Sequence, residues 1–63
     1  MTTTKQGTGF YYVSGTLNGR FVQYSLMKTF SGLWVLTKTY GDGPTYAAPF
    51  RTKRSAIATL QDA

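Results

Sequence analysis

The chain of 63 residues contains no cysteine and no histidine, and Asp42 and Asp62 are its only acidic residues. Without cysteine no disulfide can form, and without thiolates, imidazoles or a group of carboxylates no metal site can be built. The same shortage removes the usual nucleophile–base pairs and paired carboxylates of enzymes. We therefore expect a protein that is not an enzyme and that uses no cofactor, no metal and no small-molecule substrate.

Long apolar runs are missing as well. No stretch approaches the roughly 18 apolar residues of a membrane span, and the opening MTTTKQGTG lacks the apolar segment of a signal peptide. The sequence therefore predicts a soluble, cytoplasmic protein that makes no use of a membrane. A chain this short buries only about 60% of its unfolded surface. Since disulfides and metals are excluded, we expect a homodimer to supply the missing stability.

The charge that is present is almost entirely positive. Seven Lys and Arg residues against two Asp residues give a formal net charge of +5. Such a balance favours polyanionic partners, with nucleic acid first among them, although many basic proteins use the charge only for solubility.

The first half of the chain predicts a β-hairpin. Residues 1–8 are polar and have the composition of a flexible tail, so we expect one structured domain over residues 9–63. Asn18-Gly19 is a strong signal for a two-residue turn. That turn pairs Val13 with Tyr24, and it divides the ribbon into two faces. The expected core face holds Tyr11, Val13, Leu17, Val22, Tyr24 and Leu26, and the opposite face holds Phe10, Tyr12, Ser14, Thr16, Phe21, Gln23, Ser25 and Met27.

A second turn at Ser31-Gly32 leads into a third predicted strand, LWVLTKTY. If this loop also has two residues, Leu33, Val35 and Thr37 join the core, and Trp34, Leu36, Lys38 and Tyr40 join the opposite face. A bulge in the loop would exchange the two sets, because side chains alternate along a strand.

The last part of the chain predicts a loop over residues 40–45, a short edge strand at 46–48 and a C-terminal helix capped by Thr52. Ala56, Ile57 and Leu60 form an apolar stripe on this helix. The expected fold is α+β: an antiparallel sheet of three to four strands packed on one C-terminal helix. One helix covers one face of the sheet, so the other face must meet water, a ligand or a second subunit.

The helix start contains the most informative charges. It carries three cations, Arg51, Lys53 and Arg54. Each is repelled by the positive end of the helix dipole, whereas acidic residues at these positions would stabilise the helix. We interpret them as phosphate-binding residues, with a solvated charged surface as the alternative.

The open sheet face is the second candidate site. Trp34, Tyr12 and Tyr40 could stack on bases there with Lys38 beside them, although such aromatic residues also form cores and subunit interfaces. Arg20 and Lys28 are further candidates for phosphate contact, or they only solubilise the sheet edges.

Three segments resemble a known DNA-binding domain. Gly32-Leu33-Trp34-Val35, a glycine turn at 41–43, and the stretch from Phe50 to Ala56 look like the arm-type domain of tyrosine integrases, which is similar to the plant ethylene-response-factor domain. The resemblance covers about 25 residues. It implies a three-stranded sheet in the major groove, with a helix behind it and contacts from Trp34, Thr37 and Lys38. The sequence departs from the pattern in its extra N-terminal hairpin and its weak last strand.

The order of strands followed by one helix also resembles the Whirly and transcriptional-coactivator proteins, which dimerise and bind unpaired DNA. Together these features predict a nucleic-acid-binding protein, with DNA favoured over RNA. The alternative is a small phage-type accessory or inhibitor protein that binds a host protein through the exposed aromatic sheet face. Small size and the lone-domain format suggest that second role.

Overall fold

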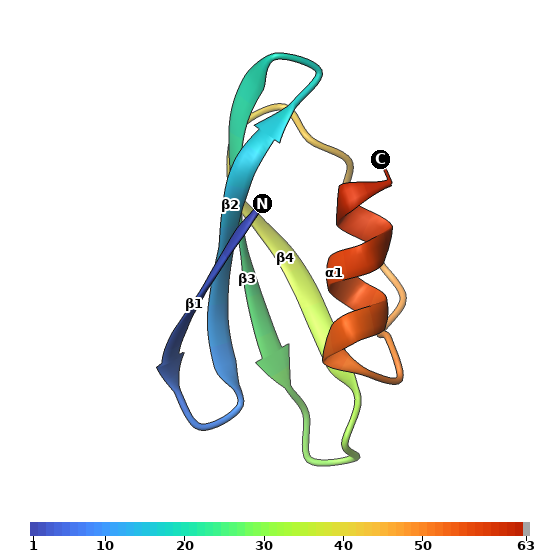
Figure 1. Ribbon diagram of the computed structural model, residues 1–63. Helices are drawn as coiled ribbons and strands as arrows, with labels where there is room; N and C mark the ends of the chain where they lie inside the picture. Colours follow the sequence, from blue (N-terminus) through green and yellow to red (C-terminus); the bar gives the residue numbers. More distant parts are fainter. Residues whose placement is uncertain (63) are drawn as a thin grey trace.

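A computed structural model describes residues 1–62, so the final residue of the predicted 9–63 domain lies outside the described residues. The chain forms an antiparallel sheet followed by one C-terminal helix, as expected for an α+β protein (Figure 1). The elements are β1 (Thr2–Gly7), β2 (Phe10–Leu17), β3 (Arg20–Lys28), β4 (Trp34–Tyr40) and α1 (Lys53–Gln61). Spatial order follows chain order, β1-β2-β3-β4. No helix in the described part is long and apolar enough to cross a membrane.

The N-terminal segment differs from its prediction. Residues 2–7 form the edge strand β1 rather than part of a flexible tail, and Thr3 and Lys5 pair with Val13 and Tyr11 of β2. The strand is exposed throughout, so its polar composition resembles that of a tail. Threonine is β-branched and favours extended backbone, and the edge of β2 supplies the hydrogen-bonding partners. The fourth strand of the sheet therefore comes from the N-terminus.

The central hairpin has the predicted register. Leu17 faces Arg20 across the Asn18-Gly19 turn, and Val13 faces Tyr24. Both turn residues have positive φ, 52° at Asn18 and 79° at Gly19, as a type I′ turn requires. This register directs the predicted apolar set toward the helix.

The third predicted strand has its two faces exchanged. The β3–β4 loop contains the five residues 29–33 instead of two, and Trp34 pairs with Lys28 and Leu36 with Leu26. Trp34, Leu36 and Lys38 therefore lie on the helix side. The faces predicted for a two-residue loop were wrong, and the exchanged faces of the alternative are the ones observed. A further irregularity opposite Gln23 and Tyr24 returns Tyr40 to the predicted open face.

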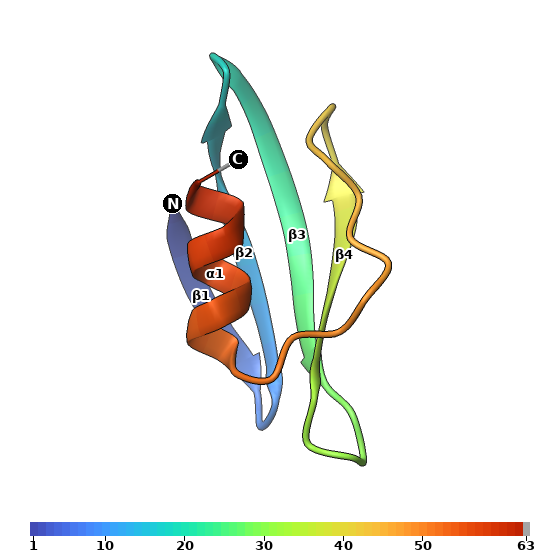
Figure 2. The ribbon, with the colours of Figure 1, turned by 90° about the vertical axis from the view of Figure 1, so that its right-hand side faces the viewer.

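Residues 41–52, here called the return loop, bring the chain from the end of β4 to the helix start (Figure 2). The expected strand at 46–48 is absent, and a single bridge joins Trp34 to Phe50 through two backbone hydrogen bonds of 2.7 Å. Pro49 has no N–H to donate and so interrupts any longer ladder. Thr52 caps α1 as predicted, because its Oγ1 accepts from the Ser55 N–H at 3.0 Å.

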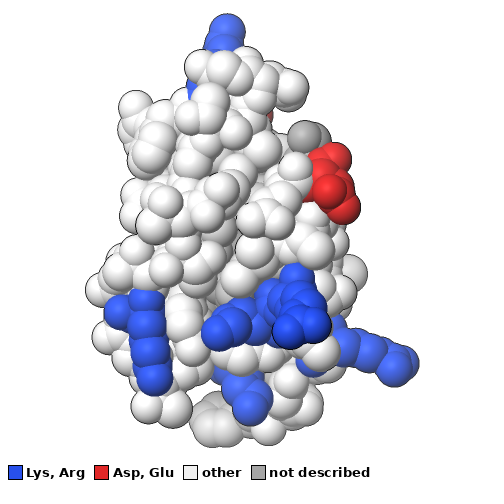
Figure 3. Space-filling model, in the orientation of Figure 1, with Lys and Arg blue, Asp and Glu red and all other residues white. Residues whose placement is uncertain are grey.

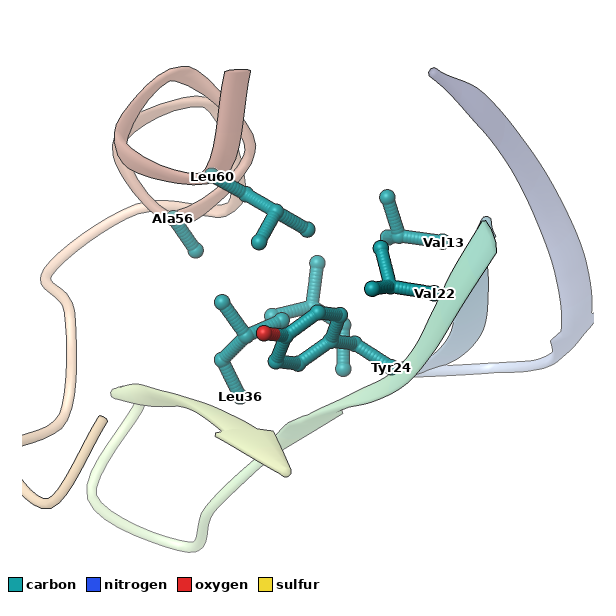
Figure 4. Packing of buried hydrophobic residues seen from close by; sticks show 7 residues of the cluster. Val13, Val22, Tyr24, Leu36, Ala56 and Leu60 are labelled. Atoms are coloured by element: carbon teal, nitrogen blue, oxygen red, sulfur yellow. The ribbon is translucent and has the colours of Figure 1, made fainter. Parts of the chain in front are cut away.

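The hydrophobic core lies between the sheet and the helix (Figure 4). Ala56 and Leu60 of α1 are fully buried, as the apolar stripe predicted, and Ile57 lies at the rim. The sheet contributes Val13, Val22, Tyr24, Leu26 and Leu36. This packing fixes the helix on one side of the sheet, and among residues 1–62 no element covers the other side (Figures 1 and 2).

Tyr24 is the one core residue with a polar group, and its hydroxyl donates to the Pro44 carbonyl at 2.5 Å. Burial raises the pKa of Tyr24 above its ordinary value of 10.0, and a negative charge on nearby Tyr46 would raise that pKa further. The folded protein therefore favours the neutral hydroxyl over the phenolate, and the neutral hydroxyl contributes to stability through its hydrogen bond. That contribution is complete below pH 10 and is lost as the pH rises through the higher pKa of the folded protein.

We expect Tyr24→Phe to lower the free energy of unfolding by about 1 kcal/mol at neutral pH, because the Pro44 carbonyl loses its partner. The difference from wild type should shrink above pH 10, where wild type loses its Tyr24 contribution and the variant has none to lose. Urea unfolding followed by circular dichroism at several pH values tests this. Parallel pH profiles for the two proteins would contradict it.

Candidate functional site

Five of the seven Lys and Arg residues gather on the helix side of the molecule, at the end where α1 begins. We call them the basic cluster: Lys5, Lys28, Arg51, Lys53 and Arg54. Figure 3 shows Lys and Arg side chains concentrated over this part of the surface, while acidic groups lie near the other end of the helix. The cluster draws on β1, the end of β3, and the loop and first turn that start the helix.

Two aromatic rings connect these segments. Lys5 pairs with Tyr11 in the sheet, and the Lys53 ammonium lies 4.2 Å from the centre of the Tyr11 ring. This is a cation–π contact. The rings of Tyr11 and Trp34 are 5.9 Å apart, and Trp34 pairs with Lys28. The two rings are therefore partly buried beneath the basic cluster, and they are in contact with Lys53 or paired in the sheet with Lys5 and Lys28.

The path of the main chain places the two arginines. Arg51 follows Phe50, whose backbone is held against Trp34, and Arg54 is the second residue of the helix. Both arginines are exposed. The first turn of α1 contains no acidic residue, so the positive end of the helix dipole and these cations act in the same direction. The arrangement favours an anion in front of the helix start.

The acidic residues lie away from this cluster. Asp42 forms an exposed ion pair of 2.8 Å with Arg20 at the far end of the sheet, and this is the one ion pair among residues 1–62. Asp62 is the C-cap residue at the opposite end of α1. The described residues therefore provide no carboxylate to neutralise the basic cluster.

The structure does not bring all of the predicted site residues together. Arg51, Lys53, Arg54 and Lys28 converge, with Trp34 half-buried among them. Lys38 lies elsewhere on the helix side, and its ammonium donates to the Gly43 carbonyl at 3.0 Å. Arg20 is engaged by Asp42, and Tyr12 and Tyr40 are on the opposite face of the sheet. The contacts expected at Trp34, Thr37 and Lys38 from the integrase resemblance are also divided between two faces.

Sequence reasoning missed Phe30, which is the most exposed large apolar side chain of the described chain at 113% relative exposure. Its loop is held in one shape: the Thr29 N–H donates to Leu33 O at 2.7 Å, and the Gly32 N–H donates to Thr29 O at 3.0 Å. Phe30 also lines a groove with Lys28, beside the basic cluster. A phenylalanine inside the predicted turn sequence TFSG was the signal that could have identified it.

The sheet face opposite the helix, here called the open face, has a different character. Its apolar members are Phe10, Tyr12, Phe21, Met27, Val35 and Tyr40, and its polar members are Thr2, Thr4, Ser14, Thr16, Gln23, Ser25 and Thr37. None of these residues is charged. The four strand cations, Lys5, Arg20, Lys28 and Lys38, all lie on the helix side by register. The two faces of the sheet therefore differ sharply in electrostatic potential.

Two other kinds of residue bear on chemistry at a site: metal ligands and tyrosines with shifted pKa values. Among residues 1–62, no three side chains of the metal-ligating types gather. The two tyrosines with raised pKa values, Tyr24 and Tyr46, belong to the packing between sheet and return loop. The basic cluster remains the best candidate site, and it is suited to an anionic ligand.

Comparison with known proteins adds no assignment, because no family model, curated protein or solved structure matches this chain.

Proposed function

We propose that this protein binds nucleic acid, DNA in the first place, through the basic cluster. The observation that supports this most directly is the convergence of five cations from separate segments with no acidic residue among them. Like charges placed together destabilise a fold unless a counter-charge is supplied. A polyanion with regularly spaced phosphates provides several counter-charges at once.

The geometry suits a phosphate backbone better than an isolated anion. The cluster extends from β1 across the start of α1 to the end of β3, so its charges are distributed over a surface rather than focused on one point. Lys53 is oriented by its contact with Tyr11, whereas Arg51 and Arg54 are exposed and can adapt. Arginine forks donate two hydrogen bonds to one phosphate and therefore hold its position.

A salt series tests the proposal. If all five cations contact phosphates, the slope of log affinity against log salt should be about −4.5 on duplex DNA and about −3.5 on a single strand. Fluorescence anisotropy with labelled single-stranded and duplex oligonucleotides measures both slopes. Absence of binding at low salt would contradict the proposal, as would an affinity that does not change with salt.

Phe30 is expected to favour nucleic acid with unpaired bases. Its ring is fully exposed beside the cluster, and aromatic stacking on a base is worth about 1–3 kcal/mol. We expect Phe30→Ala to weaken single-strand binding roughly tenfold, to leave duplex binding nearly unchanged, and to preserve stability because the ring buries nothing.

Phe30→Tyr is the matched control for this prediction, since it keeps a ring for stacking. It should bind single strands as wild type does. If Phe30→Ala weakens single-strand and duplex binding equally, Phe30 does not act by stacking on unpaired bases.

A further inference from the structure

The open face exposes several large apolar side chains next to one another, as surfaces that bind other proteins do. Phe21 is 55% exposed, Met27 51% and Tyr40 62%. The rings are already arranged in pairs, with centroids 5.3 Å apart for Phe10 and Tyr12 and 5.9 Å apart for Phe21 and Tyr40. This pre-arranged aromatic surface has the composition of an interface core, where aromatic residues and Met are enriched and charged residues are depleted.

The absence of charge on this face restricts its partner. A phosphate backbone finds no cation on it, because every strand cation lies on the helix side. Two copies of a chain with net charge +5 repel each other through most of their surfaces. The open face is the surface on which two copies can meet without bringing cations together.

The size of the face also suits a second copy. Four strands spaced about 4.8 Å apart, each about eight residues long at roughly 3.3 Å per residue, give a projected area of roughly 500 Å². Two such faces together approach the roughly 1,000 Å² that a stable interface requires. A chain of 63 residues without disulfides also gains stability from this additional burial.

We propose that the open face is the interface of a symmetric homodimer, a sandwich of two sheets with both helices outside. In this arrangement the two basic clusters point away from each other. A consequence, which rests on the proposed nucleic-acid binding, is that one dimer holds two segments of nucleic acid together. Dimerisation itself does not depend on that function.

Sedimentation over a concentration series tests the dimer. Wild type should show twice the chain mass of 7.0 kDa, and Met27→Lys should halve the observed mass because it places a buried, unpaired charge at the interface. Gln61→Lys adds the same charge at an exposed site at the end of α1 and should leave the dimer intact. Ser25→Lys, near the centre of the face, provides a second disrupting variant if Met27→Lys does not fold.

A wild-type monomer at all concentrations would overturn the proposal and would leave the face for a different protein, as an accessory role requires. A dimer that persists when Met27→Lys and Ser25→Lys are folded would overturn it as well. Energy transfer between donor- and acceptor-labelled oligonucleotides tests bridging: wild type should give transfer, and Met27→Lys should bind without transfer. A dimer that binds no oligonucleotide would refute the proposed function and leave the dimer interface standing.

Discussion

Replacing Lys53 and Arg54 together by glutamate is expected to weaken nucleic-acid binding more than 100-fold while the fold survives. Two lost phosphate contacts reduce the duplex salt slope by about 1.8, which corresponds to roughly 60-fold in affinity at 0.1 M salt. Repulsion between the new carboxylates and the phosphates adds to this loss. Anisotropy titrations of the variant and wild type at one salt concentration measure the effect.

The stability of the same variant should not fall. Lys53 loses its contact with the Tyr11 ring, which is worth about 0.5–1 kcal/mol. Against this loss, each acidic residue in the first turn of α1 interacts favourably with the helix dipole by about 0.3–1 kcal/mol. Thermal unfolding should therefore give a melting temperature equal to that of wild type or a few degrees higher.

Single substitutions provide the matched control. Arg54→Glu and Arg20→Glu change the net charge equally, but Arg54 belongs to the basic cluster and Arg20 is paired with Asp42 at the far end of the sheet. Arg54→Glu should weaken binding and raise stability, whereas Arg20→Glu should lower stability and change binding little. Equal losses of affinity would show that overall charge, and not this cluster, governs binding.

The elements that the sequence predicts well are those specified by local chemistry. Asn18-Gly19 determines the hairpin register because few other residues tolerate positive φ at both turn positions. Thr52 determines the helix start because its hydroxyl satisfies a free amide. In both cases the cause lies within a few residues of its effect.

The errors have a longer range. The polar residues of β1 form a strand only because the edge of β2 is available to them, which composition cannot show. The faces of β4 depend on a loop length, and a shift by one residue moves Lys38 and Trp34 to the helix side. That shift also removes the expected cation from the open face. The second predicted site, an aromatic and basic sheet face, thus becomes an uncharged surface, and the basic residues lie on the other side of the sheet.

Gly41→Ala is expected to lower the free energy of unfolding by several kcal/mol, about 2–5 in all, for two separate reasons. Gly41 has a φ of 94°, and an added Cβ would lie 2.5 Å from the Phe21 carbonyl oxygen and 2.9 Å from Val22 Cγ1. The left-handed conformation costs a non-glycine residue about 1–2 kcal/mol, and overpacking adds about 1–3 kcal/mol. The sum is comparable with the whole stability of a domain of this size.

Gly32→Ala separates the two causes, because Gly32 has a similar φ of 82° but no atom within 4 Å of an added Cβ. Gly32→Ala should lower the free energy of unfolding only by the cost of the left-handed conformation, about 1–2 kcal/mol. Urea unfolding of both variants at one protein concentration measures the difference. Equal losses in the two variants would show that the close approach at Gly41 is unimportant. If Gly41→Ala lowers stability more than Gly32→Ala, the additional loss comes from the close approach of the main chain at Gly41 to Phe21 and Val22. Because that loop leads to Thr52 and the start of α1, the same variant should also lose nucleic-acid binding.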